Sequence, residues 1–176
     1  LFGLSMTASQ LQFFNPGFII LLAPLFSVLW QWLASRGWEP SSSAKFGLGV
    51  LQAGLGFLLL VYGIGFADSQ GQVAMGWLAL AYLIHTTGEL CLSPVGLSMV
   101  TRLAVAKVVG LMMGVWFLAS SVAHYVAGLI AGLASVEGGA GANSVDSLTV
   151  YADTFYVVGM VGVVTGILLL LLAPLL

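Results

Sequence analysis

The sequence predicts an all-α membrane protein with five transmembrane helices, because its composition, its apolar runs and their lengths agree. Of the 176 residues, 60% are hydrophobic and only 6% are charged, whereas soluble domains carry about 25% charged residues. The mean hydropathy is +1.12. Five apolar runs are each long enough for a helix that crosses a bilayer, at about 11–33, 46–66, 73–103, 108–136 and 155–176. They lack the alternation of membrane β-strands and are too long for them.

The first run, 11–33, opens with polar residues and a proline. Asn15 directly precedes Pro16. Asn followed by Pro at the first helical position is a common start signal, which favours Asn15 as a helix N-cap. Asn15 could also line a cavity, and the two interpretations are compatible. The second run, 46–66, has an ordinary length for a span.

The third run, 73–103, is longer than one crossing needs. Taken as about 28 residues, a helix here would measure roughly 42 Å against a hydrocarbon core of ~30 Å. This helix must therefore tilt, bend or extend beyond the bilayer.

The fourth and fifth runs contain small residues four positions apart. The pairs are Gly128 with Gly132 and Gly162 with Gly166. Such pairs let helix backbones approach closely in membranes, and helix packing is their expected role. The segment between the two runs, 137–154, is polar and rich in glycine. It is predicted to be a solvated loop.

The basic residues predict the orientation of the chain. All of them fall on one side of the predicted topology, at Arg36, Lys45, Arg102 and Lys107. By the positive-inside rule this side faces the cytoplasm. The N-terminus of the chain is then predicted to be external and its C-terminus cytoplasmic.

Glu89 is the residue of the third run that most needs an explanation. A charged side chain near the centre of a bilayer costs roughly 2.5 to 3.5 kcal/mol, so it normally faces a cavity or a partner. Ser93 follows four residues later and His85 lies four before, which places the three on one helical face. Pro94 cannot donate to the carbonyl of Leu90, so a hinge is predicted just after Glu89.

Each of these polar residues also has a structural interpretation. Glu89 could bond another helix, the Ser93 hydroxyl could bond its own backbone, and His85 could form a hydrogen bond between helices. We expect a functional cavity at Glu89 and an inter-helix hydrogen bond at His85. For Ser93 both interpretations stay open.

A second polar stripe runs along the fourth span. Trp116, Ser120 and His124 recur at a spacing of four, so a ring, a hydroxyl and an imidazole share one helical face. They could wall a polar pocket. The alternative is helix packing, with Ser and His forming hydrogen bonds between helices.

The sequence also excludes several function classes. Ser93 and His85 lie about 12 Å apart along one helix, too far for direct proton transfer, and no Gly-x-Ser-x-Gly elbow accompanies Ser120 and His124. An enzyme is therefore not expected, nor is a cofactor. Four basic residues make no nucleic-acid-binding patch. The lone Cys91 excludes an internal disulfide, and no zinc-type spacing occurs.

Three motifs together point to a known family. The longest is Gly88-Glu-Leu-Cys-Leu-Ser-Pro-Val-Gly-Leu-Ser-Met-Val-Thr-Arg-Leu103, and the others are Gln12-Phe-Phe-Asn-Pro-Gly-Phe-Ile-Ile-Leu-Leu-Ala-Pro24 and Met112-Met-Gly-Val-Trp-Phe-Leu118. They resemble helices ten, eight and eleven of the proton-dependent oligopeptide transporter family, within the major facilitator superfamily. The resemblance covers nearly the whole chain. It implies helices eight to twelve of the C-terminal six-helix bundle, in a bacterial inner-membrane protein with a periplasmic N-terminus for this segment.

The resemblance also implies a function, the symport of di- and tripeptides with protons as the coupling ion. Glu89 would receive the amino terminus of the peptide and take part in proton coupling, and Asn15 would help to hold that end. Leu97 corresponds to a hydrophobic gate beside the Pro94 hinge. The implied pocket-lining positions are Ser93, Trp116, Phe117 and Ser120. A low-dielectric cavity favours the neutral carboxyl and an incoming ammonium favours the carboxylate. The binding of the peptide and the binding of the proton would thereby be linked.

The resemblance is incomplete in two places. Ala123-His124 stands where the family has Gly-Asn in its eleventh helix. The Glu-x-x-Glu-Arg motif of the family, and the cations that receive the peptide carboxylate, belong to an N-terminal bundle that this chain does not contain. We therefore interpret the chain as a fragment that does not transport alone, because alternating access requires two bundles. Its expected partners are that bundle, membrane lipid, peptides and protons, and not nucleic acid.

Two alternatives to this reading stay open. One is a related facilitator that carries nitrate or a drug. The other is a structural or accessory membrane subunit without a solute path, in which Glu89, Ser93 and Trp116 would face lipid or lie in tight contacts.

Overall fold

The computed structural model describes residues 13–68, 72–137 and 144–175, with side chains up to residue 132 and from residue 148 around the second gap. Its long helices are α2 (Phe14–Ser35), α3 (Ser42–Ile64), α4 (Met75–Leu103), α5 (Val109–Glu137) and α6 (Ser144–Leu172). Two short 3-10 turns are η1 (Ala106–Val108) and η2 (Ala173–Leu175). Five helices in the described part are long and apolar enough to cross a membrane. The prediction of an all-α membrane protein with five such helices is confirmed.

The helix ends differ from the predicted spans mainly at α6. This helix begins at Ser144, within the segment predicted to be a loop as far as Thr154. The prediction followed polarity, but helical hydrogen bonds do not require an apolar surrounding, so a helix can extend beyond its apolar part. At α3, Ser41 caps the first turn by accepting a hydrogen bond from the Ala44 amide at 3.2 Å. Residues 11–12 of the first predicted span and the glycine-rich residues 138–143 lie outside the described residues.

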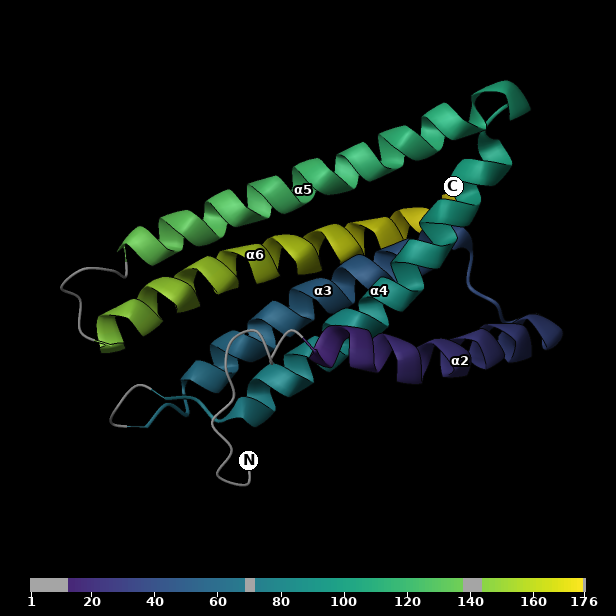
Figure 1. Ribbon diagram of the computed structural model, residues 1–176. Helices are drawn as coiled ribbons and strands as arrows, with labels where there is room; N and C mark the ends of the chain where they lie inside the picture. Colours follow the sequence, from purple (N-terminus) through teal and green to yellow (C-terminus); the bar gives the residue numbers. More distant parts are fainter. Residues whose placement is uncertain (1–12, 69–71, 138–143, 176) are drawn as a thin grey trace.

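The core of the bundle is α3, which lies between α6 and α4 (Figure 1). A Cβ added at Gly54 would lie 2.5 Å from the Val163 amide nitrogen and 2.7 Å from the Gly159 carbonyl oxygen. A Cβ at Gly162 would lie 2.8 Å from the Gly54 Cα, and one at Gly166 would lie 2.6 Å from the backbone of α3. The predicted packing role of Gly162 and Gly166 is therefore confirmed, because the two backbones touch where side chains are missing.

Close backbone contact at glycines also joins α3 to α4. A Cβ at Gly49 would lie 2.7 Å from the Gly88 carbonyl oxygen, and a Cβ at Gly88 would lie 2.8 Å from the Gly49 carbonyl oxygen. Cys91, three residues further along α4, is 2% exposed. This contact fixes the face of α4 next to Glu89 against α3. By contrast, a Cβ at Gly128 on α5 would meet nothing within 4 Å among the described residues.

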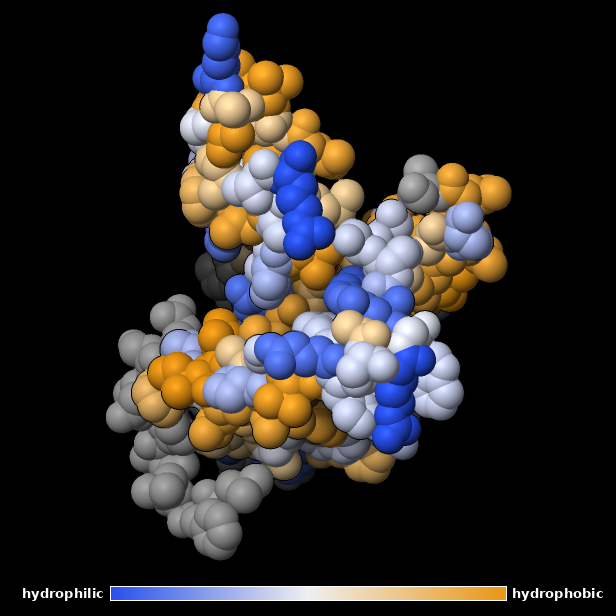
Figure 2. All heavy atoms as spheres, turned by 90° about the vertical axis from the view of Figure 1, so that its right-hand side faces the viewer, coloured by the Kyte–Doolittle hydropathy of each residue, from blue (hydrophilic) through white to orange (hydrophobic). Residues whose placement is uncertain are grey.

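The helices α2 and α5 lie at the periphery, where α2 packs across α4 and α5 runs alongside α6 (Figure 1). Figure 2 views the end of the molecule that holds the α2–α3 connection and η1, and hydrophilic side chains gather there. The basic residues belong to the helix ends at this position: they are Arg36, Lys45, Arg102 and Lys107. The predicted clustering of positive charge at one end is thus a property of the fold.

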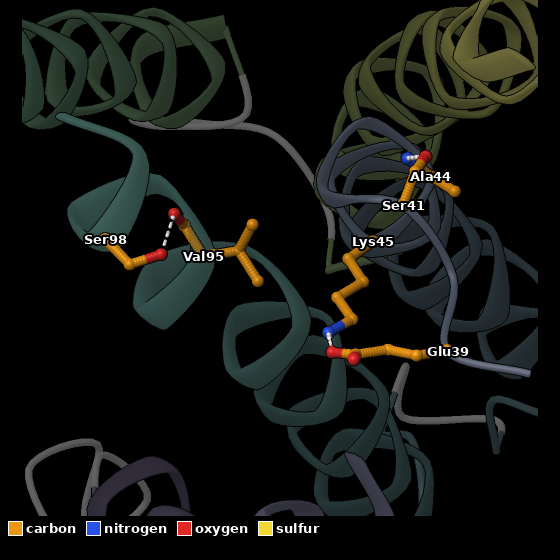
Figure 3. A network of polar contacts seen from close by, with 6 residues as sticks. All are labelled: Glu39, Ser41, Ala44, Lys45, Val95 and Ser98. Atoms are coloured by element: carbon orange, nitrogen blue, oxygen red, sulfur yellow. Dashed lines mark hydrogen bonds and ion pairs between the residues drawn. The ribbon is translucent and has the colours of Figure 1, made fainter. Parts of the chain in front are cut away.

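A buried lysine ties α2 to α3 at this end. Lys45 is only 7% exposed, and its ammonium forms an ion pair with Glu39 in the connection (Figure 3). The Lys45 Nζ atom also lies 4.5 Å from the centre of the Trp30 ring on α2. A cation over an indole face is attracted by the ring quadrupole. A buried charge without a partner is strongly unfavourable, and both contacts offset the cost of burying this ammonium group.

Replacing Lys45 by Met should therefore loosen α2 from the bundle. We expect a loss of about 1–3 kcal/mol, because the half-exposed Glu39 keeps part of its hydration when the pair is broken. The measurement is thermal unfolding of the purified chain in detergent. Unfolding is monitored through the reaction of the buried Cys91 thiol with a fluorogenic maleimide, which becomes possible when the thiol is exposed. Lys107→Met, at an exposed lysine, is the matched control and should leave the transition unchanged. Equal transitions in the two variants would contradict the assignment.

Candidate functional site

The candidate site is built on α4, which continues as one helix from Met75 through Pro94 to Leu103. Glu89 lies near the middle of this helix and is exposed in the described chain. The proline leaves the Leu90 carbonyl without its usual helical donor, although the helix does not end there. The predicted hinge at Pro94 stays a prediction.

Asn15 of α2 lies against this face of α4. Its Nδ2 atom donates to the Glu89 Oε2 atom at 3.1 Å and to the Thr86 Oγ1 atom at 3.3 Å. The N-cap residue of α2 is Phe13, so the interpretation of Asn15 as an N-cap is wrong. Pro16 is tolerated in the first turn because its missing amide hydrogen has no helical acceptor there. The amide of Asn15 is thereby available to bridge two helices.

Sequence reasoning missed Thr86, although its spacing from Glu89 offered a signal. Residues three apart share a helical face, but Thr86 was not considered as a hydrogen-bonding residue on the face of Glu89. Thr86 is 0% exposed, and its hydroxyl donates to the Tyr82 carbonyl at 2.7 Å. The three polar side chains Asn15, Thr86 and Glu89 form what we term the α2–α4 polar network.

Ser93 lies one turn beyond Glu89 and is exposed. Its hydroxyl forms no hydrogen bond with another residue that the structure describes, unlike Ser98 and Thr101, which bond carbonyls of their own helix. Leu97 follows one turn later and is partly buried. The fold thus brings the Ser93 hydroxyl to the same helical face as Glu89, with its hydrogen-bonding capacity unused within the described part of the chain.

Trp116 of α5 packs against α4 instead of lying beside Glu89. Its ring fills the space left by Gly96, where a Cβ would overlap the ring, and Phe46 of α3 lies alongside. The ring forms part of the wall of an apolar cavity of about 640 Å³, lined among others by Phe46, Gly96, Met99, Leu103 and Met112. Trp116 therefore belongs to a cavity on the side of the basic helix ends.

Of the neighbouring candidates on α5, one is partly buried and two are exposed. Ser120 is partly buried, and its hydroxyl donates to the Trp116 carbonyl of its own helix at 3.1 Å. Phe117 is 57% exposed. His124 is exposed, and its Nδ1 atom lies 2.7 Å from the Ser120 carbonyl oxygen. The structure does not join Phe117 or Ser120 to the α2–α4 polar network within the described residues.

His85 is turned away from Glu89 and toward α3. Its Nε2 atom lies 3.0 Å from the Ala53 carbonyl oxygen, and its ring packs on Phe57 with 4.8 Å between centres. Gly56 makes room for the ring, because a Cβ there would overlap it. A carbonyl only accepts, so Nε2 carries the hydrogen. The expected inter-helix hydrogen bond at His85 is confirmed.

Comparison with known proteins identifies the family. The family model described as the POT family matches residues 1–144. The chain belongs to the POT family. It is 38% identical over 176 residues to a dipeptide and tripeptide permease A of Erwinia pyrifoliae, covering 100% of this chain and 35% of that protein. It is 43% identical over 132 residues to the peptide transporter YePEPT of Yersinia enterocolitica, covering 74% and 26%.

Solved structures agree with this assignment to the POT family. A mutant of a peptide transporter POT in complex with alafosfalin matches with a TM-score of 0.75 and 33% identity, covering 99% of this chain and 33% of the other. A POT family transporter in complex with 5-aminolevulinic acid matches with a TM-score of 0.74 and 32% identity, covering 92% and 30%. The chain spans about a third of the length of the curated relatives it matches.

Family membership decides between two of the classes considered above. The matched proteins are permeases and transporters, so the hydrolase interpretation of the Ser and His residues is set aside. The long apolar helices and the bacterial relatives make the chain part of a multi-pass bacterial membrane protein.

Proposed function

We propose that this chain forms one wall of the solute path in a transporter that moves di- and tripeptides together with protons, and that Glu89 receives the amino-terminal ammonium of the peptide. The observation that carries the proposal is the hydrogen bond between Asn15 and Glu89, which joins two helices at an exposed carboxylate. The names of the curated relatives, dipeptide and tripeptide permeases, support the substrate class.

The geometry suits an ammonium group. The Asn15 nitrogen faces Glu89 and Thr86, and its Oδ1 atom, on the other arm of the amide, accepts no hydrogen bond from another residue that the structure describes. A carboxylate and an amide oxygen side by side supply acceptors for two of the three donors of an ammonium. A charge-assisted hydrogen bond of this kind is shorter and stronger than a neutral one. A free α-amino group is thus the substrate feature that this site selects.

Proton coupling follows from the same carboxyl group. A water-poor cavity favours the neutral carboxyl, whereas a bound ammonium favours the carboxylate. Peptide binding and proton release at Glu89 are then linked, and the linkage is reciprocal. No cofactor takes part in this scheme.

The remaining candidate residues complete the proposed path. Ser93, Trp116, Phe117 and Ser120 would line it, while Pro94 and Leu97 would act as hinge and gate. The opposite wall, with cations for the peptide carboxylate, would come from an N-terminal bundle outside this chain. Alternating access would then arise from movement of the two bundles around a site near the middle of the membrane.

The orientation in the membrane is part of this proposal. Positive charge at one end of the bundle would place the α2–α3 connection and η1 in the cytoplasm, by the positive-inside rule. The N-terminal end of α2 would then face the periplasm, and the end of α6 the cytoplasm, across the inner membrane.

The nitrate carrier and the structural subunit are less well supported. A nitrate carrier would place an anion beside the exposed carboxylate of Glu89, and like charges at short range repel. A purely structural subunit without a solute path is disfavoured by the relatives, because the matched proteins are permeases and transporters.

Acetylation of the peptide amino group tests the proposal directly. The intact transporter is reconstituted in liposomes, and uptake of Ala-Ala under an inward proton gradient is compared with uptake of N-acetyl-Ala-Ala. We expect uptake of the acetylated peptide to be at least tenfold lower, because it lacks the ammonium charge that a hydrogen bond to Glu89 requires. Equal uptake of both peptides would refute the assignment of Glu89 to the amino terminus, and accumulation of neither would favour another solute.

A further inference from the structure

We infer that one side of α2 binds an anionic phospholipid, with the lipid phosphate at Arg36 and an acyl chain along the helix. Because α2 packs across α4, its opposite side is exposed (Figure 1). This side carries what we term the α2 stripe, the exposed side chains Leu21, Leu25, Val28, Trp32 and Arg36. Their spacing of three and four residues places them on one helical face. The inference does not depend on the proposed transport of peptides.

Arg36 ends the α2 stripe with a cation that is held in place. Its guanidinium carbon lies 4.2 Å from the centre of the Trp32 ring. The quadrupole of an indole attracts a cation over its face, and a guanidinium presents its N–H donors in a planar fork that matches phosphate. Because the ring already restricts this side chain, less conformational freedom is lost when a phosphate binds.

The charge of Arg36 has no anionic partner among the residues that the structure describes. The carboxylate nearest in sequence, Glu39, forms its ion pair with Lys45 instead. That pair is neutral, so the end of α2 keeps one uncompensated positive charge. A zwitterionic headgroup would bring its own cation toward Arg36, whereas an anionic headgroup brings only negative charge. Charge complementarity therefore favours an anionic lipid.

The apolar part of the α2 stripe has the length of an acyl chain in one leaflet. Leu21, Leu25 and Val28 are each at least 62% exposed, and Trp32 is 44% exposed. From Leu21 to Trp32 the helix rises roughly 16 Å, and half of the hydrocarbon core measures about 15 Å. Indole rings prefer the level of the headgroups. Trp32 thus lies where an acyl chain along the stripe would give way to the phosphate.

The turn after α2 keeps a second indole close to Arg36. Gly37 has a φ angle of 70°, a conformation that glycine adopts without steric cost. The chain turns back there, and the Trp38 amide donates to the Leu33 carbonyl oxygen at 2.9 Å. Trp38 is itself exposed. Two exposed indoles beside one unpaired cation are the composition expected at the boundary between acyl chains and headgroups.

Arg102 provides a matched control at the same end of the molecule. It is exposed in the last turn of α4, but in the described part of the chain its guanidinium lies over no aromatic ring. The helix α5 also exposes apolar side chains, among them Leu111 and Leu118, without a cation held on a ring at its end. A general attraction of anionic lipid to positive charge would therefore appear in Arg102→Gln as well.

The experiment measures lipid binding to the intact transporter in nanodiscs of phosphatidylcholine. Phosphatidylglycerol with a photoreactive diazirine in one acyl chain is added at increasing mole fraction, and labelling of the segment that contains the α2 stripe is quantified by peptide mass spectrometry. We expect the half-saturating mole fraction to rise about fivefold in Arg36→Gln, the factor that corresponds to about 1 kcal/mol for one basic residue at an anionic surface.

The other variants and probes separate the parts of the inference. Trp32→Leu should raise the half-saturating mole fraction about two- to fivefold, since an exposed cation–ring contact is lost. Arg102→Gln should bind as the parent does. Photoreactive phosphatidylcholine should label the stripe more weakly than phosphatidylglycerol and equally in all variants. Excess soluble glycerol phosphate should not reduce the labelling.

Several results would overturn the assignment. An unchanged half-saturation in Arg36→Gln would mean that another part of the intact transporter covers the α2 stripe. An equal rise in Arg102→Gln would mean diffuse attraction to the positive end. Competition by glycerol phosphate would assign Arg36 to a free phosphate and not to a lipid. If Trp32→Leu does not fold, Trp32→Phe, which keeps a smaller ring, must show a smaller rise in the same direction.

Discussion

Replacing Glu89 by Gln in the intact transporter is expected to abolish peptide accumulation driven by a proton gradient. Gln has the same shape and its side-chain oxygen can still accept from Asn15, so the α2–α4 polar network is retained. What is lost is the ability of the side chain to bind and release a proton. We expect accumulation to fall to the level seen without a gradient, a loss of about fivefold to 150-fold, which is the range that a coupling free energy of 1–3 kcal/mol covers. The measurement is uptake of a labelled dipeptide into liposomes at a fixed proton gradient.

Peptide exchange without a gradient separates coupling from folding. Counterflow needs no net movement of protons, so Glu89→Gln should keep measurable exchange in liposomes loaded with unlabelled peptide. Asp153→Asn is the matched control, because Asp153 is an exposed carboxylate on α6 and lies outside the proposed path. It should accumulate peptide as the parent does. Full gradient-driven accumulation by Glu89→Gln would remove Glu89 from the coupling scheme.

The second large effect is expected on stability, from Gly54→Ala. The new Cβ would meet the backbone of α6 at Val163 and Gly159, at 2.5 and 2.7 Å. Backbone atoms cannot rotate away as a flexible side chain does, so α3 and α6 must separate along their contact. We expect a loss of about 3 kcal/mol from this overpacking. The measurement is the fraction of the chain that stays monodisperse in detergent after heating.

Gly128→Ala distinguishes packing from helix propensity. A Cβ at Gly128 meets nothing within 4 Å among the described residues, and Ala is the better helix former by up to about 1 kcal/mol. Gly128→Ala should therefore be neutral or slightly stabilising in the same assay. Similar losses in both variants would show that the α3–α6 contact is not as close as Gly54 indicates.

The residues of the candidate site show where sequence reasoning succeeds and where it stops. Glu89 stood out because a charge in an apolar span is unfavourable wherever the other helices lie, so it can be recognised from the sequence of that span alone. His85 was correctly expected to bond another helix. Asn15 was interpreted partly as an N-cap, since a local pattern of Asn before Pro carries no information about a residue 74 positions away that accepts its hydrogen bond.

Helix ends and helix packing faces were also only partly predictable from the sequence. The loop predicted up to Thr154 is helical from Ser144, because polarity marks the limit of the apolar segment and not of the helix. Of the two glycine pairs, Gly162 and Gly166 pack against α3, while Gly128 has open space in the described structure. Spacing four positions apart is identical in both pairs. Only the position of the neighbouring helix tells them apart.

The sequence by itself therefore determined the class of the protein, its five membrane helices and the residue at the centre of the candidate site. These follow from hydrophobicity and from the free energy of a charge in an apolar surrounding, both of which are properties of single segments. Only the tertiary structure decided that Asn15 reaches Glu89, that the same amide also donates to Thr86, and that Lys45 pairs with Glu39. Those contacts depend on which helices lie side by side, and helix packing is set by the sum of many contacts along the chain.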